Sequence, residues 1–227
     1  MIMENLARRQ QPDDAVESKL PVCPPVTSFR PMEPGVTAAL GSLHGIAYGP
    51  WRDHPTSAEE WELPDMVNSS LTEPPLEEDG KLLASGAVII EPDHRVWVAH
   101  LNEPFNAACV GFPTARKDPK LSLQATAIRE SWEKTGLQVR IVGWLGDFDE
   151  EVTRTRYYLA ARVGGAPAAC GWQRPTMSLV TLDALMQYPA LRVSPTEAKC
   201  LAALQNVLNI SPDWSTPSSV MPRRSLA

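Results

Sequence analysis

The clearest pattern along the chain is a pair of apolar runs on either side of a short polar turn. The residues after Lys81 read LLASGAVII, and a second apolar run covers Val96–His100. Between them, Glu91–His94 contains Pro92 and Asp93, which are residues typical of turns. Two strand-like runs joined by such a turn predict a β-hairpin.

Three more segments have strand patterns. Val139–Leu145 and Thr153–Ala161 alternate or run apolar, with the acidic segment Asp147–Glu151 as a predicted loop between them. Ser178–Leu182 is a shorter candidate strand. With the hairpin, these segments predict a sheet of at least five strands.

A helix is predicted over Leu121–Thr135, because its apolar residues recur at steps of four, three and four. Gly136 is expected to end this helix. Two late helices are predicted at Leu182–Tyr188 and Pro195–Leu208. The second has the capping-box pattern of a serine followed three residues later by a glutamate. The residues of the apolar stripe are Leu121, Ala125, Ile128 and Trp132, and those of the capping box are Ser194 and Glu197.

The N-terminal part of the chain is irregular, because half of the 22 prolines fall before residue 80. Residues 1–35 are predicted to form a disordered arm, and residues 211–227 a flexible tail. Residues 36–80 also contain three aromatic residues that a solvated linker rarely carries, so this extension is predicted to pack on the core. Its aromatic residues are Tyr48, Trp51 and Trp61, and its short helical candidates are Val36–Leu43 and Thr56–Trp61.

Composition excludes several classes of protein. The chain has 21 basic and 27 acidic residues, a net charge of −6 that argues against a general nucleic-acid binder. No apolar run is long enough to span a membrane, and the N-terminus resembles neither a signal nor a transit peptide, so a cytoplasmic location is expected. The four cysteines are widely spaced and are expected to be reduced, and the four histidines form no HExxH metal motif.

The predicted central helix also carries two acidic residues that suggest metal chemistry. On a helical wheel, Glu130 and Glu133 lie opposite the apolar stripe and are neighbours on the surface. Two such carboxylates could share a hard cation such as Mg²⁺. An ordinary solvated helix face with ion pairs explains the same residues.

The segment GFPTARKDPKLSLQATAIRESWEKTGLQV, residues 111–139, resembles the box of the Nudix hydrolases, G-x5-E-x7-R-E-U-x-E-E-x-G-U with U aliphatic. The phrases SLQATAIRES and TRYYLAAR further resemble a bacterial Nudix group with a proline- and tryptophan-containing N-terminal extension. The resemblance covers roughly residues 82–208. It implies an α/β fold of the Nudix type: an α/β/α sandwich with a mixed sheet at 81–210, preceded by the irregular extension. A chance match to an unrelated α/β domain is the remaining alternative.

The resemblance also implies roles for individual residues. Arg129 would orient a carboxylate, and Glu130 and Glu133 would be catalytic residues that hold Mg²⁺ or Mn²⁺. The box departs from the family pattern at four positions. They are Ala115 for the first glycine, Leu121 for the early glutamate, Ser131 for an aliphatic residue and Lys134 for the last glutamate.

Lys134 is the departure with the largest physical effect. Replacing a negative by a positive charge about 5 Å from Mg²⁺ changes the Coulomb energy by about 3 kcal/mol even at the dielectric constant of water. Lys134 also follows Glu130 by four residues, the favourable order for a helical ion pair. Its ammonium is therefore a candidate for the position that a metal would occupy.

The remaining candidates lie outside the helix. In the family a loop often supplies the general base, which here gives Glu150 or one of its acidic neighbours. Arg116 is a candidate for binding phosphate and Trp172 for stacking on a base, although surface charge and core packing are the ordinary roles of such residues. The other residues considered for these roles are Asp147, Asp149, Glu151, Lys117, Arg156, Trp51 and Trp144.

The sequence thus supports two functions. The first is magnesium-dependent hydrolysis of a phosphoanhydride in a nucleoside diphosphate linked to another moiety. The second is an impaired Nudix module that binds a nucleotide or a protein partner without chemistry. Lys134 is the residue that discriminates between them.

Overall fold

The computed structural model describes residues 27–29, 41–63, 65–101, 109–167, 177–187 and 193–210. The strands are β1 (Thr27–Phe29), β2 (Ser42–Leu43), β3 (Ile46–Ala47), β4 (Leu82–Ile90), β5 (Val96–Leu101), β6 (Cys109–Gly111), β7 (Thr114–Arg116), β8 (Leu137–Asp149), β9 (Thr153–Gly165) and β10 (Met177–Val180). The helices are α1 (Ala58–Trp61), α2 (Leu123–Thr135), α3 (Leu182–Gln187) and α4 (Pro195–Ile210).

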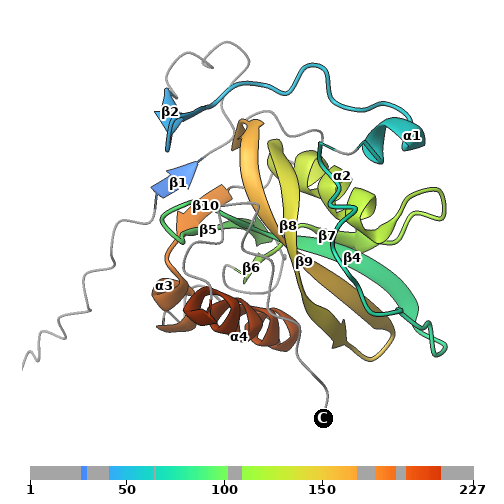
Figure 1. The fold of residues 1–227 in the computed structure, drawn as a ribbon. Helices are drawn as coiled ribbons and strands as arrows, with labels where there is room; N and C mark the ends of the chain where they lie inside the picture. The colour runs from blue at the N-terminus through green and yellow to red at the C-terminus, as the bar shows by residue number, and fades with distance from the viewer. Residues whose placement is uncertain are drawn as a thin grey trace, which may run out of the picture.

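One mixed sheet forms the centre of the molecule (Figure 1). Its order is β1-β10-β5-β4-β9-β8, with β6 paired to β5 and β7 paired to β4. β4 and β9 are parallel, and the other pairs are antiparallel. The predicted hairpin is confirmed, since β4 and β5 pair with Ile90 opposite Val96.

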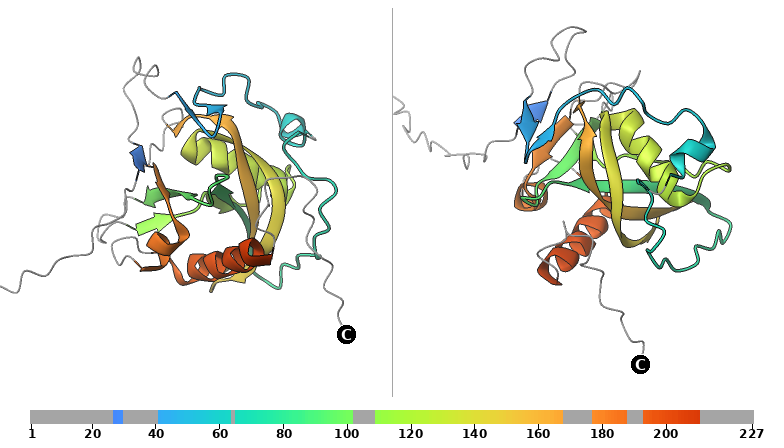
Figure 2. Two further views of the ribbon diagram at one scale, coloured as in Figure 1. Left: turned by 60° about the vertical axis from the view of Figure 1, so that its left-hand side comes forward. Right: turned by 45° about the horizontal axis from the view of Figure 1, so that its top comes forward.

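The two faces of the sheet carry separate apolar cores. Side chains alternate along β4, as they must in a strand: Ile89 lies in the core under α2, and Ile90 lies in the core under α4. Both isoleucines are fully buried. The two views in Figure 2 show α2 and α4 on opposite sides of the sheet. The predicted α/β/α sandwich with a mixed sheet is therefore confirmed.

The N-terminal segment from residue 41 to residue 80 follows the side of the sheet that α2 covers (Figures 1 and 2). Trp61 is buried and packs edge-on against Trp51, with ring centroids 5.8 Å apart, and at 6.1 Å from Trp132 of α2. The backbone carbonyl of Met66 accepts a hydrogen bond from Ile141 of β8. This segment thus contacts both the helix and the sheet.

The same segment covers a buried ion pair. Arg162 and Glu91 have fully buried side chains, and the guanidinium of Arg162 donates to both oxygens of Glu91. Arg162 also donates to the carbonyl of Leu43 at 2.9 Å, and it lies 4.9 Å from the ring centre of Tyr48. A buried charge needs such partners, because water cannot reach it.

Several predicted elements differ from those in the structure. The predicted acidic loop at Asp147–Glu151 is wrong for its first three residues, which extend β8 because Asp147 and Asp149 pair across the hairpin with arginines of β9. The helix predicted to reach Leu43 is wrong at its end, where β2 forms; its residues 36–40 lie outside the described part. Other elements shift by one to four residues at their ends.

β1 lies inside the arm that was predicted to be disordered, so that prediction is wrong for Thr27–Phe29. The strand pairs with the edge of β10 through its backbone, which requires no side-chain pattern. The remainder of residues 1–35, and the tail at 211–227, lie outside the described residues. Within the described residues, no helix has the length and apolar character needed to cross a membrane.

Candidate functional site

The helix α2 is fixed at both ends by its own sequence and by the N-terminal segment. Ser122 is the N-cap and accepts a hydrogen bond from the Ala125 amide at 3.1 Å. The carboxylate of Glu62 accepts from the amide and the hydroxyl of Ser122. Gly136 ends the helix with a φ of 71°, a left-handed conformation that glycine adopts without strain.

The predicted apolar stripe of α2 faces the core, but the prediction that Glu130 points away from the interior is wrong. Glu130 is only 6% exposed, and Ser131 beside it is fully buried. The helical wheel assumed one solvated face, whereas the sheet, β7 and the N-terminal segment surround α2 on several sides. Glu133 lies on the open part, with its side chain 48% exposed.

Arg129 is the centre of an acidic cluster. Its Nη1 donates to Oδ2 of Asp118 at 2.6 Å, its Nη2 lies 3.7 Å from Oε1 of Glu130, and its Nε lies 3.6 Å from Oε1 of Glu133. The hydrogen bond from Arg129 holds the pKa of Asp118 below its usual value. The arginine thus joins the loop before α2 to both glutamates of the helix.

Lys134 binds the other oxygen of Glu130. Its Nζ lies 3.7 Å from Oε2 of Glu130 and donates a hydrogen bond to the backbone carbonyl of Thr114, the first residue of β7. Burial raises the pKa of Glu130, and the attraction of Lys134 acts in the opposite direction. Glu130 therefore lies between two cations of the chain, one at each oxygen.

The end of β7 and the loop that leads to α2 are rich in basic residues. Arg116 and Lys120 are exposed and Lys117 is half-buried, and within the described part of the chain none of the three belongs to an ion pair. The one acidic residue of the loop, Asp118, is already bound to Arg129. The segment that leads into α2 therefore carries positive charge without an ion-pair partner among the described residues.

A cavity of about 340 Å³ lies on the flank of α2 beside Arg129 and Glu133. The N-terminal segment supplies one wall through Ser57 and Trp61, and the loop supplies Lys120. The basic loop, α2 and the N-terminal segment thus meet around one opening.

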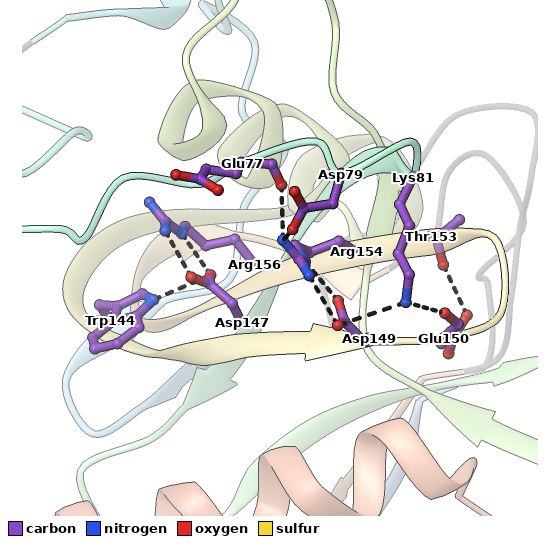
Figure 3. A network of polar contacts seen from close by, with 10 residues as sticks. All are labelled: Glu77, Asp79, Lys81, Trp144, Asp147, Asp149, Glu150, Thr153, Arg154 and Arg156. Atoms are coloured by element: carbon purple, nitrogen blue, oxygen red, sulfur yellow. Dashed lines mark hydrogen bonds and ion pairs between the residues drawn. The ribbon is translucent and has the colours of Figure 1, made fainter.

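The structure does not join Glu150 to this cluster. Glu150 is exposed, and its carboxylate accepts a hydrogen bond from the hydroxyl of Thr153 at 3.0 Å, while its backbone carbonyl accepts one from Lys81 (Figure 3). Among the described contacts, none links Glu150 with Glu130 or Glu133. Its role as a base therefore has no geometric support in this arrangement.

The neighbouring acids are tied to arginines of β9. Asp147 accepts two hydrogen bonds from Arg156, and Asp149 accepts two from Arg154, as Figure 3 shows. The side chain of Arg156 is only 3% exposed, so it is not available on the surface for phosphate. Trp172 lies outside the described residues.

Sequence reasoning missed Asp118 and Glu73. Asp118 lies eleven residues before Arg129, a separation without helical or strand periodicity, so no spacing rule joins the two. Glu73 is an acidic residue in a proline-rich segment, and its carboxylate accepts from Gln124, Arg156 and Tyr158. No sequence signal would have drawn attention to Glu73, other than the resemblance to proteins with an N-terminal extension.

The carboxylates of α2 do not fit a divalent metal as they are arranged. A hard cation such as Mg²⁺ or Mn²⁺ needs several free oxygen ligands. Both oxygens of Glu130 face cations of the chain, and Oε1 of Glu133 faces Arg129. Over the described ranges, no group of three or more His, Cys, Asp or Glu side chains is placed to hold a metal ion.

Comparison with known proteins gives a family match. The sequence model of the NUDIX domain matches residues 80–204. A search of curated proteins found no match. The solved structures with similar folds include the ORF135 protein of E. coli, with 15% identity and a TM-score of 0.49 over 62% of this chain and 99% of that chain. They also include an ADP-ribose pyrophosphatase from Streptococcus suis, with 20% identity and a TM-score of 0.42 over 55% of this chain and 92% of that chain.

Proposed function

The chain belongs to the NUDIX domain family, and on that premise we propose that it binds a nucleoside diphosphate linked to another moiety without metal-dependent hydrolysis. The loop between β7 and α2 and the adjacent face of α2 would hold the diphosphate. The observation that carries the proposal is that both oxygens of Glu130 already face cations of the chain, Arg129 and Lys134.

Charge supports the binding of an anion at this place. Arg116 ends β7, Lys117 and Lys120 lie on the loop after it, and no carboxylate within the described residues forms an ion pair with them. A diphosphate presents several anionic oxygens, which favour charge-assisted hydrogen bonds from such groups. The overall charge of −6 then limits binding to a local contact and disfavours a long nucleic acid.

Hydrolysis is the second candidate function, and one observation favours it. Arg129, Glu130 and Glu133 keep the order and spacing of the Nudix box, and Arg129 pairs with both glutamates. In that case Mg²⁺ or Mn²⁺ would have to displace Lys134 from Glu130. The general base would then come from a residue outside the helix, and Glu150 remains the proposed residue.

Two measurements on the purified full chain test the proposal. Isothermal calorimetry with ADP-ribose as the probe should show binding, and incubation of the same mixture with Mg²⁺ or Mn²⁺ should leave the probe intact. Replacing Lys120 by alanine should weaken binding several-fold, whereas Lys199→Ala, at an exposed position of α4, should not.

The outcomes separate the two candidates. Cleavage of ADP-ribose that depends on the metal and disappears in Glu133→Gln would replace the binding function by hydrolysis. If a panel of nucleoside diphosphate derivatives is neither bound nor cleaved, both candidates are wrong.

A further inference from the structure

We infer that the ammonium of Lys134 is the resident cation of this site and contacts the diphosphate in the place of a divalent metal. The inference deepens the proposed function and rests on it for the identity of the ligand. It assigns to Lys134 a role in binding that a surface ion pair would not have.

The position of the ammonium is built from two segments of the chain. Its Nζ donates to the backbone carbonyl of Thr114 on β7 and lies 3.7 Å from a carboxylate oxygen of Glu130 on α2. A carbonyl and a carboxylate are the oxygen ligands that a hard cation takes. The ammonium group therefore has the coordination expected of a small cation at the point where the loop meets the helix.

The ammonium also has a donor left for a ligand. A lysine side chain carries three N–H donors, of which the hydrogen bond to Thr114 uses one; Glu130, at 3.7 Å, is an ion-pair partner only. The side chain is 30% exposed, so a remaining donor can reach a ligand from the solvent side. A phosphate oxygen placed there would accept a hydrogen bond from the ammonium.

Glu130 explains why the cation is fixed at this position. Its side chain is 8% exposed, and an ionised carboxylate with so little solvent needs a nearby positive charge. Lys134 supplies that charge as part of the fold. A dication brought to about 5 Å from the ammonium would be repelled enough to lose more than about tenfold in affinity, even at the dielectric constant of water.

The first part of the test concerns the metal and needs no ligand. The melting temperatures of the parent, Lys134→Gln and Lys134→Glu are compared with excess Mg²⁺ and with excess EDTA. The parent should not respond, and Lys134→Glu should gain Mg²⁺-dependent stabilisation, with a smaller gain in Lys134→Gln because Glu130 becomes free. Lys199→Gln is the matched control and should behave as the parent does.

Mg²⁺-dependent stabilisation of the parent that equals that of Lys134→Glu would overturn the inference. If Lys134→Glu fails to fold, the melting temperature of Lys134→Gln is the test. A folded Lys134→Gln whose melting temperature does not respond to Mg²⁺ would show that the ammonium does not occupy a metal position.

The second part measures the affinity for ADP-ribose in EDTA and in Mg²⁺. The parent should bind equally well in both, and Lys134→Gln should bind about tenfold more weakly in both, from the loss of one charge near the diphosphate. Binding by the parent only in the presence of Mg²⁺, or unchanged binding by Lys134→Gln, would contradict the inference. If the parent binds ADP-ribose in neither condition, the proposed function fails for this ligand, and the metal measurement alone then decides the role of Lys134.

Discussion

Glu73 and Tyr158 are 85 residues apart in the sequence, and the tyrosine hydroxyl donates to the glutamate carboxylate at 2.6 Å. The same carboxylate accepts from Nη1 of Arg156 at 2.9 Å and from the amide of Gln124 at 2.5 Å. One residue of the N-terminal segment therefore links α2 with β9. On this basis we propose that the described part of the predicted extension, residues 41–63 and 65–80, belongs to the folded unit and is not a linker.

Replacing Glu73 by alanine should lower the free energy of unfolding by about 1–3 kcal/mol, because buried donors on three residues lose their acceptor. Chemical denaturation of the parent and the variant measures this difference. Glu77→Ala is the matched control, since Arg154 contacts the backbone carbonyl of Glu77, which the substitution retains. An equal loss in the two variants would show that the carboxylate of Glu73 is not the anchor.

Trp61 should contribute more than any polar contact of the segment. Its side chain is 5% exposed and packs against Trp51 and Trp132, so Trp61→Ala should cost about 3–5 kcal/mol. In a chain of this length that corresponds to a fall in melting temperature of several degrees. Leu63→Ala, at a position 48% exposed, should change the melting temperature little. A small effect of Trp61→Ala would mean that the segment is loosely attached.

The main features of the fold could be predicted from the sequence because they depend on local patterns. The apolar runs of β4 and β5, the steps of the stripe on α2 and the glycine at position 136 each specify an element without knowledge of its neighbours. The exposure of Glu130 could not be predicted in the same way. It depends on how β4, β7 and β8 pack around α2, which no local pattern specifies.

The site shows the same division. Lys134 could be recognised as a partner of Glu130 because the two residues lie one helical turn apart. The carbonyl of Thr114, which holds the ammonium from the other side, has no signature in a sequence, since every residue has a carbonyl. The bond between Asp118 and Arg129 likewise depends on the path of the loop, which no periodic pattern specifies.

Asp149 should give the protein an acid-sensitive contact. The hydrogen bond from Arg154 lowers the pKa of Asp149 to about 2, further helped by the charge of Lys81. A carboxylate with a lowered pKa adds stability that is present above its unfolded pKa, about 3.9, and is lost as the pH falls through the folded value. The difference in melting temperature between the parent and Asp149→Asn should therefore shrink between about pH 4 and pH 2.

Glu151→Gln is the control for this pH dependence, because Glu151 is exposed and, among the described residues, has no charged partner. Its difference from the parent should be small over the same range. A difference between the parent and Asp149→Asn that stays constant down to pH 2 would contradict the role of the ion pair.

Asp118 should order the basic loop. Its carboxylate accepts from Arg129 at 2.6 Å and from the amide of Lys120 at 2.9 Å. In Asp118→Ala the Lys120 amide should exchange hydrogen faster, and ADP-ribose should bind several-fold more weakly, because a mobile loop must be ordered on binding. Asp183→Ala, at an exposed position of α3, is the control. Faster hydrogen exchange with unchanged affinity for ADP-ribose would show that the loop is not part of the binding site.

The parallel pairing of β4 with β9 also constrains the order of events during synthesis of the chain. The hairpin of β8 and β9 closes over a short turn, but β4 finds its parallel partner only after the whole intervening segment, α2 included, has been made. The N-terminal segment leaves the ribosome before all of these elements. Its anchor Glu73 has no complete set of donors until Tyr158 has been added, so the part of the protein that is made early is expected to dock late.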